Sequence, residues 1–303
     1  MKNGKMTLRS AISLAGVQTW TASVMPCALG TALACASGHR LLPWRALLCL
    51  AAAVGLQCAV NTLNDRRDFV SGLDSAENCP DRSDAALVYD GVSPRAALEL
   101  AAAFLLGAGV CGAALLALCG RGLLAYAAAG LAAIVLYTQP GLRFYTLPLG
   151  EALSGTVMGG VLPLAAYHVQ AGAPDMRIAA ACVSAAVLIG CIMLVNNTCD
   201  IEKDAQSRRT LPGLIGRSAA RRLLRVCLAA SDAGIAAAVL LLFPRGAAVL
   251  PVMAAALALA PENRLLSRAS LTMADRPQCM AGVCRAVRLR LGFYCLACLA
   301  AAL

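Results

Sequence analysis

The 303-residue chain is poor in charge, in aromatic rings and in histidine. Charged residues make up 14% of it, aromatic residues 4%, and there are two histidines. Soluble domains carry about 25% charged residues, so a soluble enzyme, a disordered chain and a nucleic-acid-binding protein all fit poorly. Hydrophobic residues reach 60%, and the mean hydropathy is +0.72. This composition is typical of an all-α, polytopic membrane protein.

Nine apolar runs predict nine transmembrane helices within a single domain that covers residues 1–303. A bilayer is crossed by roughly 20 apolar residues. The runs lie at 10–36, 43–63, 96–119, 122–138, 149–170, 177–198, 223–243, 246–262 and 287–303. They are rich in Ala and Gly, and small residues allow close helix packing in lipid. The first run also has features of a cleaved signal peptide, but the eight further runs favour a retained helix.

The basic residues predict an orientation. The net charge is +10, and cytoplasmic loops of membrane proteins carry an excess of Lys and Arg. A cytoplasmic N-terminus places 21 of the 26 Lys and Arg residues on the inside. We therefore expect a multi-pass protein of the cell membrane with its N-terminus in the cytoplasm, in contact with membrane lipid and with no nucleic-acid partner.

The fifteen cysteines do not form a pattern typical of a disulfide or zinc protein. Most lie inside the apolar runs, where a free thiol behaves as a small hydrophobic group. Cys295 and Cys298 form a C-x-x-C pair, but it lies on the apolar last run. Packing is the expected role of these residues.

Two polar segments follow the second and sixth runs, both on the expected cytoplasmic side. In each, polar side chains recur every three or four residues, so they share one helix face. Ionisable groups at the end of an apolar span are costly to desolvate and usually face an internal cavity. The shared-face residues are Asn61, Asn64, Asp65 and Asp68 in the first segment and Asn196, Asp200 and Asp204 in the second.

Carboxylates of this kind predict a magnesium site. Two of them about 4 Å apart repel by about 4 kcal/mol at an effective dielectric of 20, and a divalent cation removes that repulsion. Oxygen ligands without His or Cys favour Mg²⁺, which usually combines one or two carboxylates with water and substrate phosphate. Nearby cations could neutralise the rest of a di- or polyphosphate. These cations are Arg66, Arg67, Arg143, Lys203, Arg208 and Arg209.

The two segments also predict an internal repeat. The second Asn-x-x-x-Asp, at 196–200, lies 135 residues after the first, at 61–65. Each follows the second run of a four-run set. We therefore expect two four-helix pseudo-repeats, with the ninth helix added, and with the two motifs meeting at the interface between the repeats.

These motifs resemble the UbiA superfamily of intramembrane prenyltransferases over nearly the whole chain. Within it, they are similar to the branch that acts on 1,4-dihydroxy-2-naphthoate in menaquinone biosynthesis. The matching strings are Asn64-Asp65-x-x-Asp68-x-x-x-Gly72-x-Asp74, Gly91-Val-Ser93-Pro94, Tyr137-Thr138, Leu149-Gly150-Glu151 and Asn196-Asn197 with Arg209-Thr210-Leu211.

The resemblance implies transfer of a polyprenyl chain from its diphosphate to 1,4-dihydroxy-2-naphthoate. CO₂ and diphosphate would be lost, and the product would be demethylmenaquinol. It implies Mg²⁺ as the cofactor and no obligate protein partner. Asp65, Asp68, Asp200 and Asp204 are then the expected catalytic and metal-binding residues. The expected substrate-binding residues are Asn61, Asn64, Asp74, Tyr137, Arg143, Tyr145, Asn197 and Lys203.

One departure and two alternatives remain. The family often begins its first span with Arg-Pro, but this chain has Gly16-Val17, so an arginine expected to help hold the diphosphate is missing. A different aromatic acceptor, such as a hydroxybenzoate or a porphyrin, is compatible with the same motifs. A secondary transporter also has repeats and embedded acids, but transporter sites usually lie near the bilayer midplane.

Overall fold

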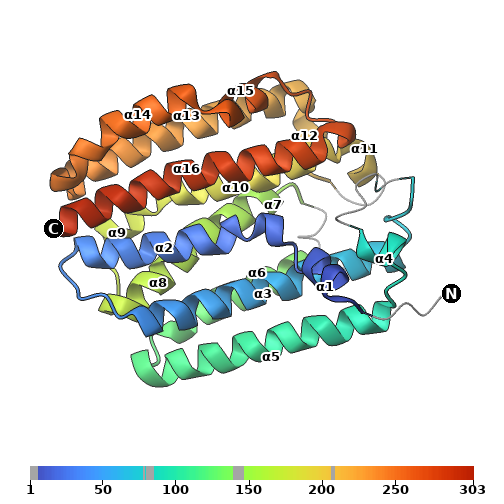
Figure 1. Cartoon of the computed structure of the whole chain (residues 1–303), viewed down its shortest axis with the longest axis horizontal. Helices are drawn as coiled ribbons and strands as arrows, with labels where there is room; N and C mark the ends of the chain where they lie inside the picture. The colour runs from blue at the N-terminus through green and yellow to red at the C-terminus, as the bar shows by residue number, and fades with distance from the viewer. Residues whose placement is uncertain (1–5, 78, 80–84, 139–146, 206–208) are drawn as a thin grey trace.

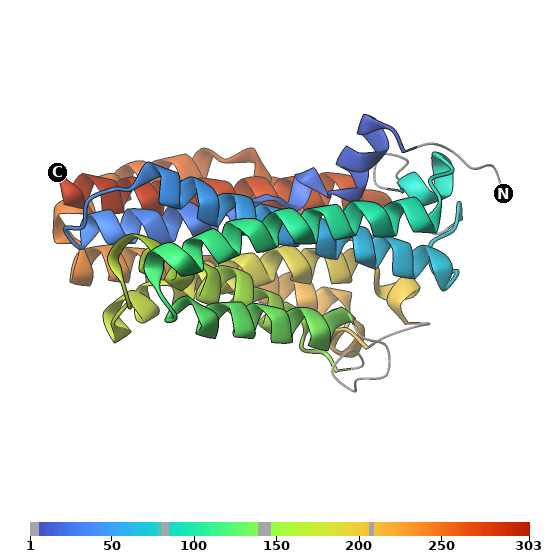
Figure 2. The same cartoon turned by 90° about the horizontal axis from the view of Figure 1, so that it is seen from below.

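The computed structural model describes residues 6–77, 79, 85–138, 147–205 and 209–303, without the side chains of 137 and 138. These residues form helices whose long members run along one axis in both views (Figure 1, Figure 2). The two chain ends lie at opposite ends of the bundle in Figure 1.

The helices follow one another in a simple order. The first half contains α1 (Leu8–Leu14), η1 (Val17–Thr19), α2 (Thr21–Ala36), α3 (Pro43–Val70), α4 (Ala86–Tyr89), α5 (Pro94–Cys119) and α6 (Leu123–Thr138). The middle contains α7 (Gly150–Ser154), η4 (Gly155–Val161), α8 (Leu162–Ala171), α9 (Met176–Ala181), α10 (Val183–Cys199), α11 (Ile201–Asp204) and α12 (Leu211–Ile215). The last part contains α13 (Arg217–Leu242), η5 (Pro244–Ala248), α14 (Val249–Leu259), α15 (Pro261–Arg268), η6 (Met273–Asp275) and α16 (Arg276–Ala302).

The chain is an all-α, multi-pass membrane protein, but the predicted count of nine spans is not confirmed. Within the described ranges, six helices are long and apolar enough to cross a bilayer, and a bent pair would make seven. The run 122–138 gives only a shorter apolar helix, Leu123–Leu136. The run 246–262 is bent by 50° between α14 and α15. The last run lies within α16, which begins at Arg276 and carries four arginines.

The predicted first helix, 10–36, is broken at Gly16. Gly16 has a φ of 61°, and it separates α1 from η1 and α2. α2 packs in the centre of the bundle, with Leu29 and Leu33 fully buried, against α8 and α16. α2 and α10 are the most buried spans, whereas α5 is the least buried.

Both polar segments lie at the same end of the bundle. α3 is longer than the predicted 43–63 because it stays helical to Val70, so the first motif lies on its last three turns. α10 ends at Cys199, and Asp200 joins it to α11. The amide of Asp204 still donates to the carbonyl of Asp200 at 2.8 Å, so the helical face continues. Figure 1 shows α1, α4, α11 and α12 gathered here, at what we call the polar end.

Several residues that carry the family resemblance end or begin helices. Ser93 caps α5 by accepting a hydrogen bond from Ala96, with Pro94 in the first turn. Thr210 caps α12 in the same way through Gly213. These are the residue types that helix N-termini prefer. Gly72, with a φ of 78°, reverses the chain after α3.

The bend between α14 and α15 is held by a polar cluster around the buried side chain of Arg290. Pro261 has no N–H to donate to the carbonyl of Leu257, and the Asn263 side chain donates to that carbonyl instead, at 2.8 Å. Arg290 on α16 in turn donates to Asn263 and makes two hydrogen bonds to Asp232 on α13. The cluster therefore connects four helices, α13 to α16.

We expect Arg290→Met to lower the stability of the protein by about 3 kcal/mol, because it leaves the Asp232 carboxylate without its partner. The double variant Arg290→Met with Asp232→Leu should recover most of that loss. Thermal unfolding in detergent measures both. Arg285→Met, on an exposed position of the same helix, is the control, and an equal loss there would contradict this role.

Candidate active site

One cavity of about 830 Å³ opens among α3, α5, α6, η4, α10 and the start of α16. Its polar end is lined by both acidic motifs. Asn61, Asn64, Asp65, Asp68 and Asp74 come from the first motif and its following loop, and Asn196, Asp200, Lys203 and Asp204 come from the second. Segments about 135 residues apart in the chain therefore face one space, as the repeat pattern predicts.

Some predicted site residues do not line the cavity or lie outside the described part of the chain. Asn197 is not among the lining residues, and neither are the predicted cations Arg66 and Arg209. Arg143 and Tyr145, together with Arg208, lie outside the described residues, as does the side chain of Tyr137. The roles of these residues stay predictions.

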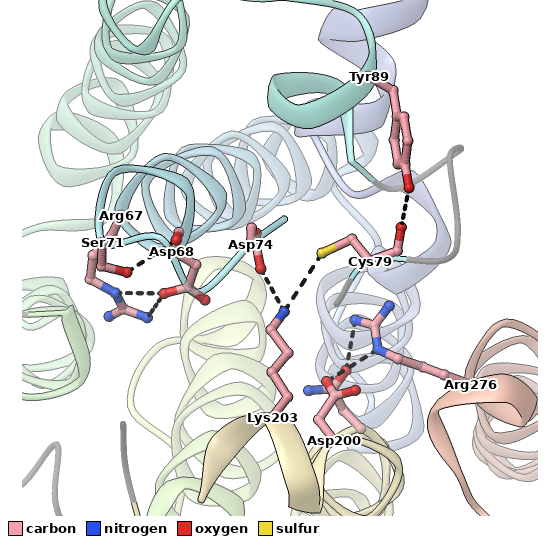
Figure 3. Close-up of polar contacts among 10 residues, drawn as sticks. Arg67, Asp68, Ser71, Asp74, Cys79, Tyr89, Asp200, Lys203 and Arg276 are labelled. Carbon is pink, nitrogen blue, oxygen red and sulfur yellow. Dashed lines mark hydrogen bonds and ion pairs between the residues drawn. The ribbon is translucent and has the colours of Figure 1, made fainter. Parts of the chain in front are cut away.

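An ion pair joins the two motifs across the cavity. Lys203 Nζ on α11 donates to Asp74 Oδ1 at 2.6 Å, and both side chains are mostly buried (Figure 3). Burial alone would lower the pKa of Lys203, but the hydrogen bond and charge of Asp74 outweigh it and raise the pKa above its ordinary value. Lys203 is therefore a permanent cation rather than a base at neutral pH.

A second cation comes from a helix that the sequence patterns do not single out. Arg276, at the start of α16, also lines the cavity. Its Nε lies 3.2 Å from Asp200 Oδ2, and its Nη2 donates to Asn196 Oδ1 at 3.0 Å (Figure 3). Arg276 lies 76 residues after Asp200 in the chain, so no local spacing connects it to the motif.

The position of Arg276 is supported by a clamp behind the site. Arg217, the first residue of α13, makes two hydrogen bonds to Glu202 on α11 and donates to the carbonyl of Leu271, in the loop before α16. The hydrogen bonds from Arg217 lower the pKa of Glu202. One side chain thus ties the second motif to the segment that presents Arg276.

The carboxylates do not form a ready-made metal cage. Asp68 is paired with Arg67 at 3.0 Å, and no three His, Cys, Asp or Glu side chains in the described part of the chain lie close enough together to hold a metal ion. Mg²⁺ rarely uses such a cage and instead shares its coordination with substrate phosphates. Asn64 Oδ1 is buried and lacks a hydrogen-bond partner among the described residues. Two facing carboxylate sets and a spare amide oxygen fit a magnesium-bound anion.

Residues 23–280 match the model of the UbiA prenyltransferase family. The chain belongs to this family. It is 34% identical to the 1,4-dihydroxy-2-naphthoate octaprenyltransferase of Bacillus subtilis over 218 residues, which are 70% of this chain and 67% of that protein. It is 31% identical to the enzyme of that name from Mycobacterium tuberculosis, over 76% of this chain and 77% of the other.

Solved structures show the UbiA fold for this chain. A UbiA homologue from Archaeoglobus fulgidus superposes with a TM-score of 0.60 at 18% identity and covers 96% of this chain and 99% of its own. The same homologue bound to GPP and Mg²⁺ gives a TM-score of 0.57 at 17% identity, with the same coverage. At this identity the likeness shows the fold alone.

Two asparagines of this UbiA-family chain make structural bonds. Asn197 Nδ2 donates to Glu151 Oε1 at 2.8 Å, and both residues are buried. Asn61 Nδ2 donates to the carbonyl of Ala15 and to Thr19 Oγ1, each at 3.2 Å. Their amide nitrogens therefore fix neighbouring helices, and only Asn61 of the two lines the cavity.

The position of Asn61 leaves no room for a side chain at Gly16. A Cβ built on Gly16 would lie 2.3 Å from Asn61 Nδ2, and the φ of 61° disfavours any other residue. A side chain at this position would displace Asn61. The cations that line the cavity are Arg67 on α3, Lys203 on α11 and Arg276 on α16.

The Cys79 thiol is not an activated nucleophile, although it faces the cavity. Burial raises its pKa to about 11, and the nearby Lys203 offsets this only in part. The thiol is therefore protonated at neutral pH. Tyr89 Oη donates to the Cys79 carbonyl at 2.8 Å (Figure 3) and holds this residue in place.

We expect Gly16→Ala to lower the stability and the activity of the protein more than Gly38→Ala does. Both glycines have positive φ, but a Cβ on Gly38 meets nothing within 4 Å. Backbone strain alone costs about 1–2 kcal/mol, which is the loss expected for Gly38→Ala in thermal unfolding. Gly16→Ala should lose more stability and, through Asn61, most of the activity. Equal behaviour of the two variants would contradict the proposed contact.

Proposed function

We propose that this protein transfers a polyprenyl chain from polyprenyl diphosphate to 1,4-dihydroxy-2-naphthoate, with Mg²⁺ as its cofactor. CO₂ and diphosphate are released, and the product is demethylmenaquinol. The observation that carries the proposal is the single cavity whose polar end is lined by both acidic motifs and by the cations that pair with them. The named relatives support the choice of donor and acceptor class.

The carboxylates of the two motifs would hold the metal ion together with the diphosphate. Asp65 and Asp68 approach from α3, and Asp200 and Asp204 approach from the end of α10 and from α11. When bound, Mg²⁺ supplies Lewis-acid stabilisation of the leaving diphosphate. Asn64 Oδ1 is an additional oxygen donor in the same motif.

Lys203 and Arg276 would bind the diphosphate itself. Without a ligand they neutralise Asp74 and Asp200. A bound diphosphate offers these cations a new partner and leaves the carboxylates free for metal. Arg276 is suited to this role because a guanidinium can make two parallel hydrogen bonds to phosphate oxygens.

The reaction balances without an oxidant or a separate base. The bond between the allylic carbon and the diphosphate oxygen breaks, and the allylic cation is attacked by the ring carbon that bears the carboxylate. The carboxylate leaves as CO₂ and returns its electron pair to the ring, which restores aromaticity. A cavity within the bilayer keeps water away from the cation.

The polar end is proposed to face the cytoplasm. The predicted inside segments carry 21 of the 26 basic residues, and 11 of these lie in the two segments that follow the motifs, as the positive-inside rule expects. Water-soluble acceptor and Mg²⁺ would then reach the motifs from the cytoplasm, while the prenyl chain stays in the membrane.

We expect Asp65→Asn and Asp200→Asn each to lower prenyl transfer by about 100-fold or more, because each removes a charge that stabilises the metal-bound diphosphate. The assay incubates membranes with octaprenyl diphosphate and dihydroxynaphthoate, and it measures product mass. Hydroxybenzoate in a parallel reaction tests the acceptor. Glu99→Gln removes an exposed carboxylate on α5 and should leave the rate unchanged.

Full activity in either aspartate variant would exclude the proposed clamp. A hydroxybenzoate product in place of the naphthol product would keep the reaction class and change the acceptor. Chelation with EDTA should stop turnover, and added Mg²⁺ should restore it.

We expect Arg276→Gln to lower kcat/KM for the diphosphate donor by about tenfold to hundredfold, the usual value of hydrogen bonds to charged groups. Arg276→Lys should recover part of the loss. Steady-state kinetics over a range of donor concentrations measure the effect. Arg285→Gln, nine residues further along α16, should have the kcat/KM of the wild type. An unchanged kcat/KM in Arg276→Gln would exclude the proposed contact.

A further inference from the structure

A group of exposed arginines lies beside the polar end and outside the cavity. Two helices carry it, and they meet along one edge of the bundle (Figure 1). Arg221 on α13 donates to the carbonyl of Ser267 on α15 at 3.2 Å and so joins them. We call the group the arginine patch, and none of its members is among the residues that line the cavity. The members are Arg222 and Arg225 on α13 and Arg264 and Arg268 on α15.

The arginine patch has no acidic partner. Within the described residues, no carboxylate makes an ion pair with any of its members. The segment 217–268 contains two acids, and Asp232 is paired with Arg290 whereas Glu262 is buried. On each helix the two patch arginines are three or four residues apart, so they share one face and repel each other. An anion bound from outside would remove that repulsion.

The arginine patch lies at the depth of lipid headgroups. α13 begins at the polar end, where Arg217 bonds to Glu202. The 17 residues 226–242 carry one charged side chain, that of Asp232. They span about 25 Å of helix, which approaches the roughly 30 Å thickness of a bilayer core. The arginines of α13 are therefore at the edge of the hydrocarbon.

α15 has the form of a helix that lies in the membrane interface. It is bent by 50° from the apolar α14. Glu262 and Leu266 are buried on one face, and Arg264 and Arg268 are exposed two residues further along, on the opposite face. Short helices with a basic face of this kind bind anionic lipid surfaces.

The arginine patch is next to the segment that presents Arg276. This segment runs from the end of α15 to the start of α16, and α13 holds it at two points. Arg221 donates to the carbonyl of Arg268, and Arg217 donates to the carbonyl of Leu271. Leu271 is buried, and it is the only described residue other than glycine with a positive φ, 56°. Such a backbone persists only where its surroundings hold it, so a shift of α15 against α13 would move Arg276.

We propose that the arginine patch binds the phosphate of an anionic phospholipid and that this lipid holds Arg276 in place for the diphosphate donor. The binding site rests on the patch alone, whereas its effect on catalysis rests on the proposed function. Guanidinium groups make parallel hydrogen bonds to phosphate oxygens, so one headgroup connects α13 to α15. The occupant is a lipid because the patch lies where anionic headgroups are concentrated.

The first test measures lipid binding to the purified full-length protein by native mass spectrometry, with equal amounts of phosphatidylglycerol and phosphatidylcholine in the detergent. The wild type should retain phosphatidylglycerol in preference. One variant combines Arg222→Gln with Arg225→Gln, and another combines Arg264→Gln with Arg268→Gln. Each should lower this retention about twentyfold, because an arginine near an anionic lipid surface contributes about fivefold.

The control variant combines Arg121→Gln with Arg245→Gln. Both arginines are exposed, and they follow the ends of α5 and α13, at the opposite end of the bundle from the arginine patch. The control loses the same charge as each patch variant and should retain phosphatidylglycerol as the wild type does. An equal loss in the control, or equal retention of the two lipids by the wild type, would overturn the proposal.

The second test measures kcat/KM for octaprenyl diphosphate in nanodiscs of phosphatidylcholine with and without phosphatidylglycerol. Phosphatidylglycerol should raise kcat/KM about tenfold in the wild type and in the control, because arginine contacts to the lipid then hold Arg276. Both patch variants should lose this rise. Their kcat/KM in phosphatidylcholine alone should equal that of the wild type, which shows that they are folded. Soluble glycerol phosphate should not replace the lipid.

Each other outcome has a distinct meaning. A rise in kcat/KM with glycerol phosphate would overturn the assignment of a lipid as the ligand. Retention of phosphatidylglycerol by the patch without any rise in kcat/KM would overturn the link to Arg276. A wild-type protein that retains this lipid but consumes no donor in either nanodisc would instead refute the proposed function and leave the lipid site intact.

Discussion

The structure depends on the neutralisation of carboxylates by cations at one end of a helix bundle. Charges in such a place are expensive to desolvate, and two of the acids that line the cavity pair with a cation from another helix. Asp74 is paired with Lys203, and Asp200 is paired with Arg276. The first pair joins the two motifs, and the second joins the second motif to α16. These are also the groups that a magnesium diphosphate would use. The same side chains therefore stabilise the ligand-free protein and would bind the ligand.

The rest of the fold keeps these partners in reach. Gly16 breaks the first helix so that Asn61 can bond to Ala15 and Thr19. Arg217 connects α11 to the loop before α16. Below the charges, the cavity continues along small residues of α5 such as Ala108 and Gly112. Breaks and small residues, which weaken isolated helices, here create the space that the proposed chemistry needs.

The sequence predicts the family, the all-α membrane fold and the two acidic segments, because apolar runs and helical spacing are local properties. It does not predict Arg276, whose partner Asp200 is distant in the chain. The helical spacing correctly places Asn196 on the cavity face, but the resemblance names Asn197, which does not line the cavity. The sequence also does not predict the helix breaks at Gly16 and between α14 and α15. They depend on bonds to Asn61 and Asn263, which only the packed bundle brings into place.

The most direct test of a shared diphosphate site is calorimetric titration of the purified protein with inorganic pyrophosphate, with and without Mg²⁺. The account predicts binding that requires Mg²⁺ and that is lost equally in Asp65→Asn and in Asp200→Asn, since both motifs hold one ligand. Binding that needs no Mg²⁺, or that survives in one of the two variants, would contradict it.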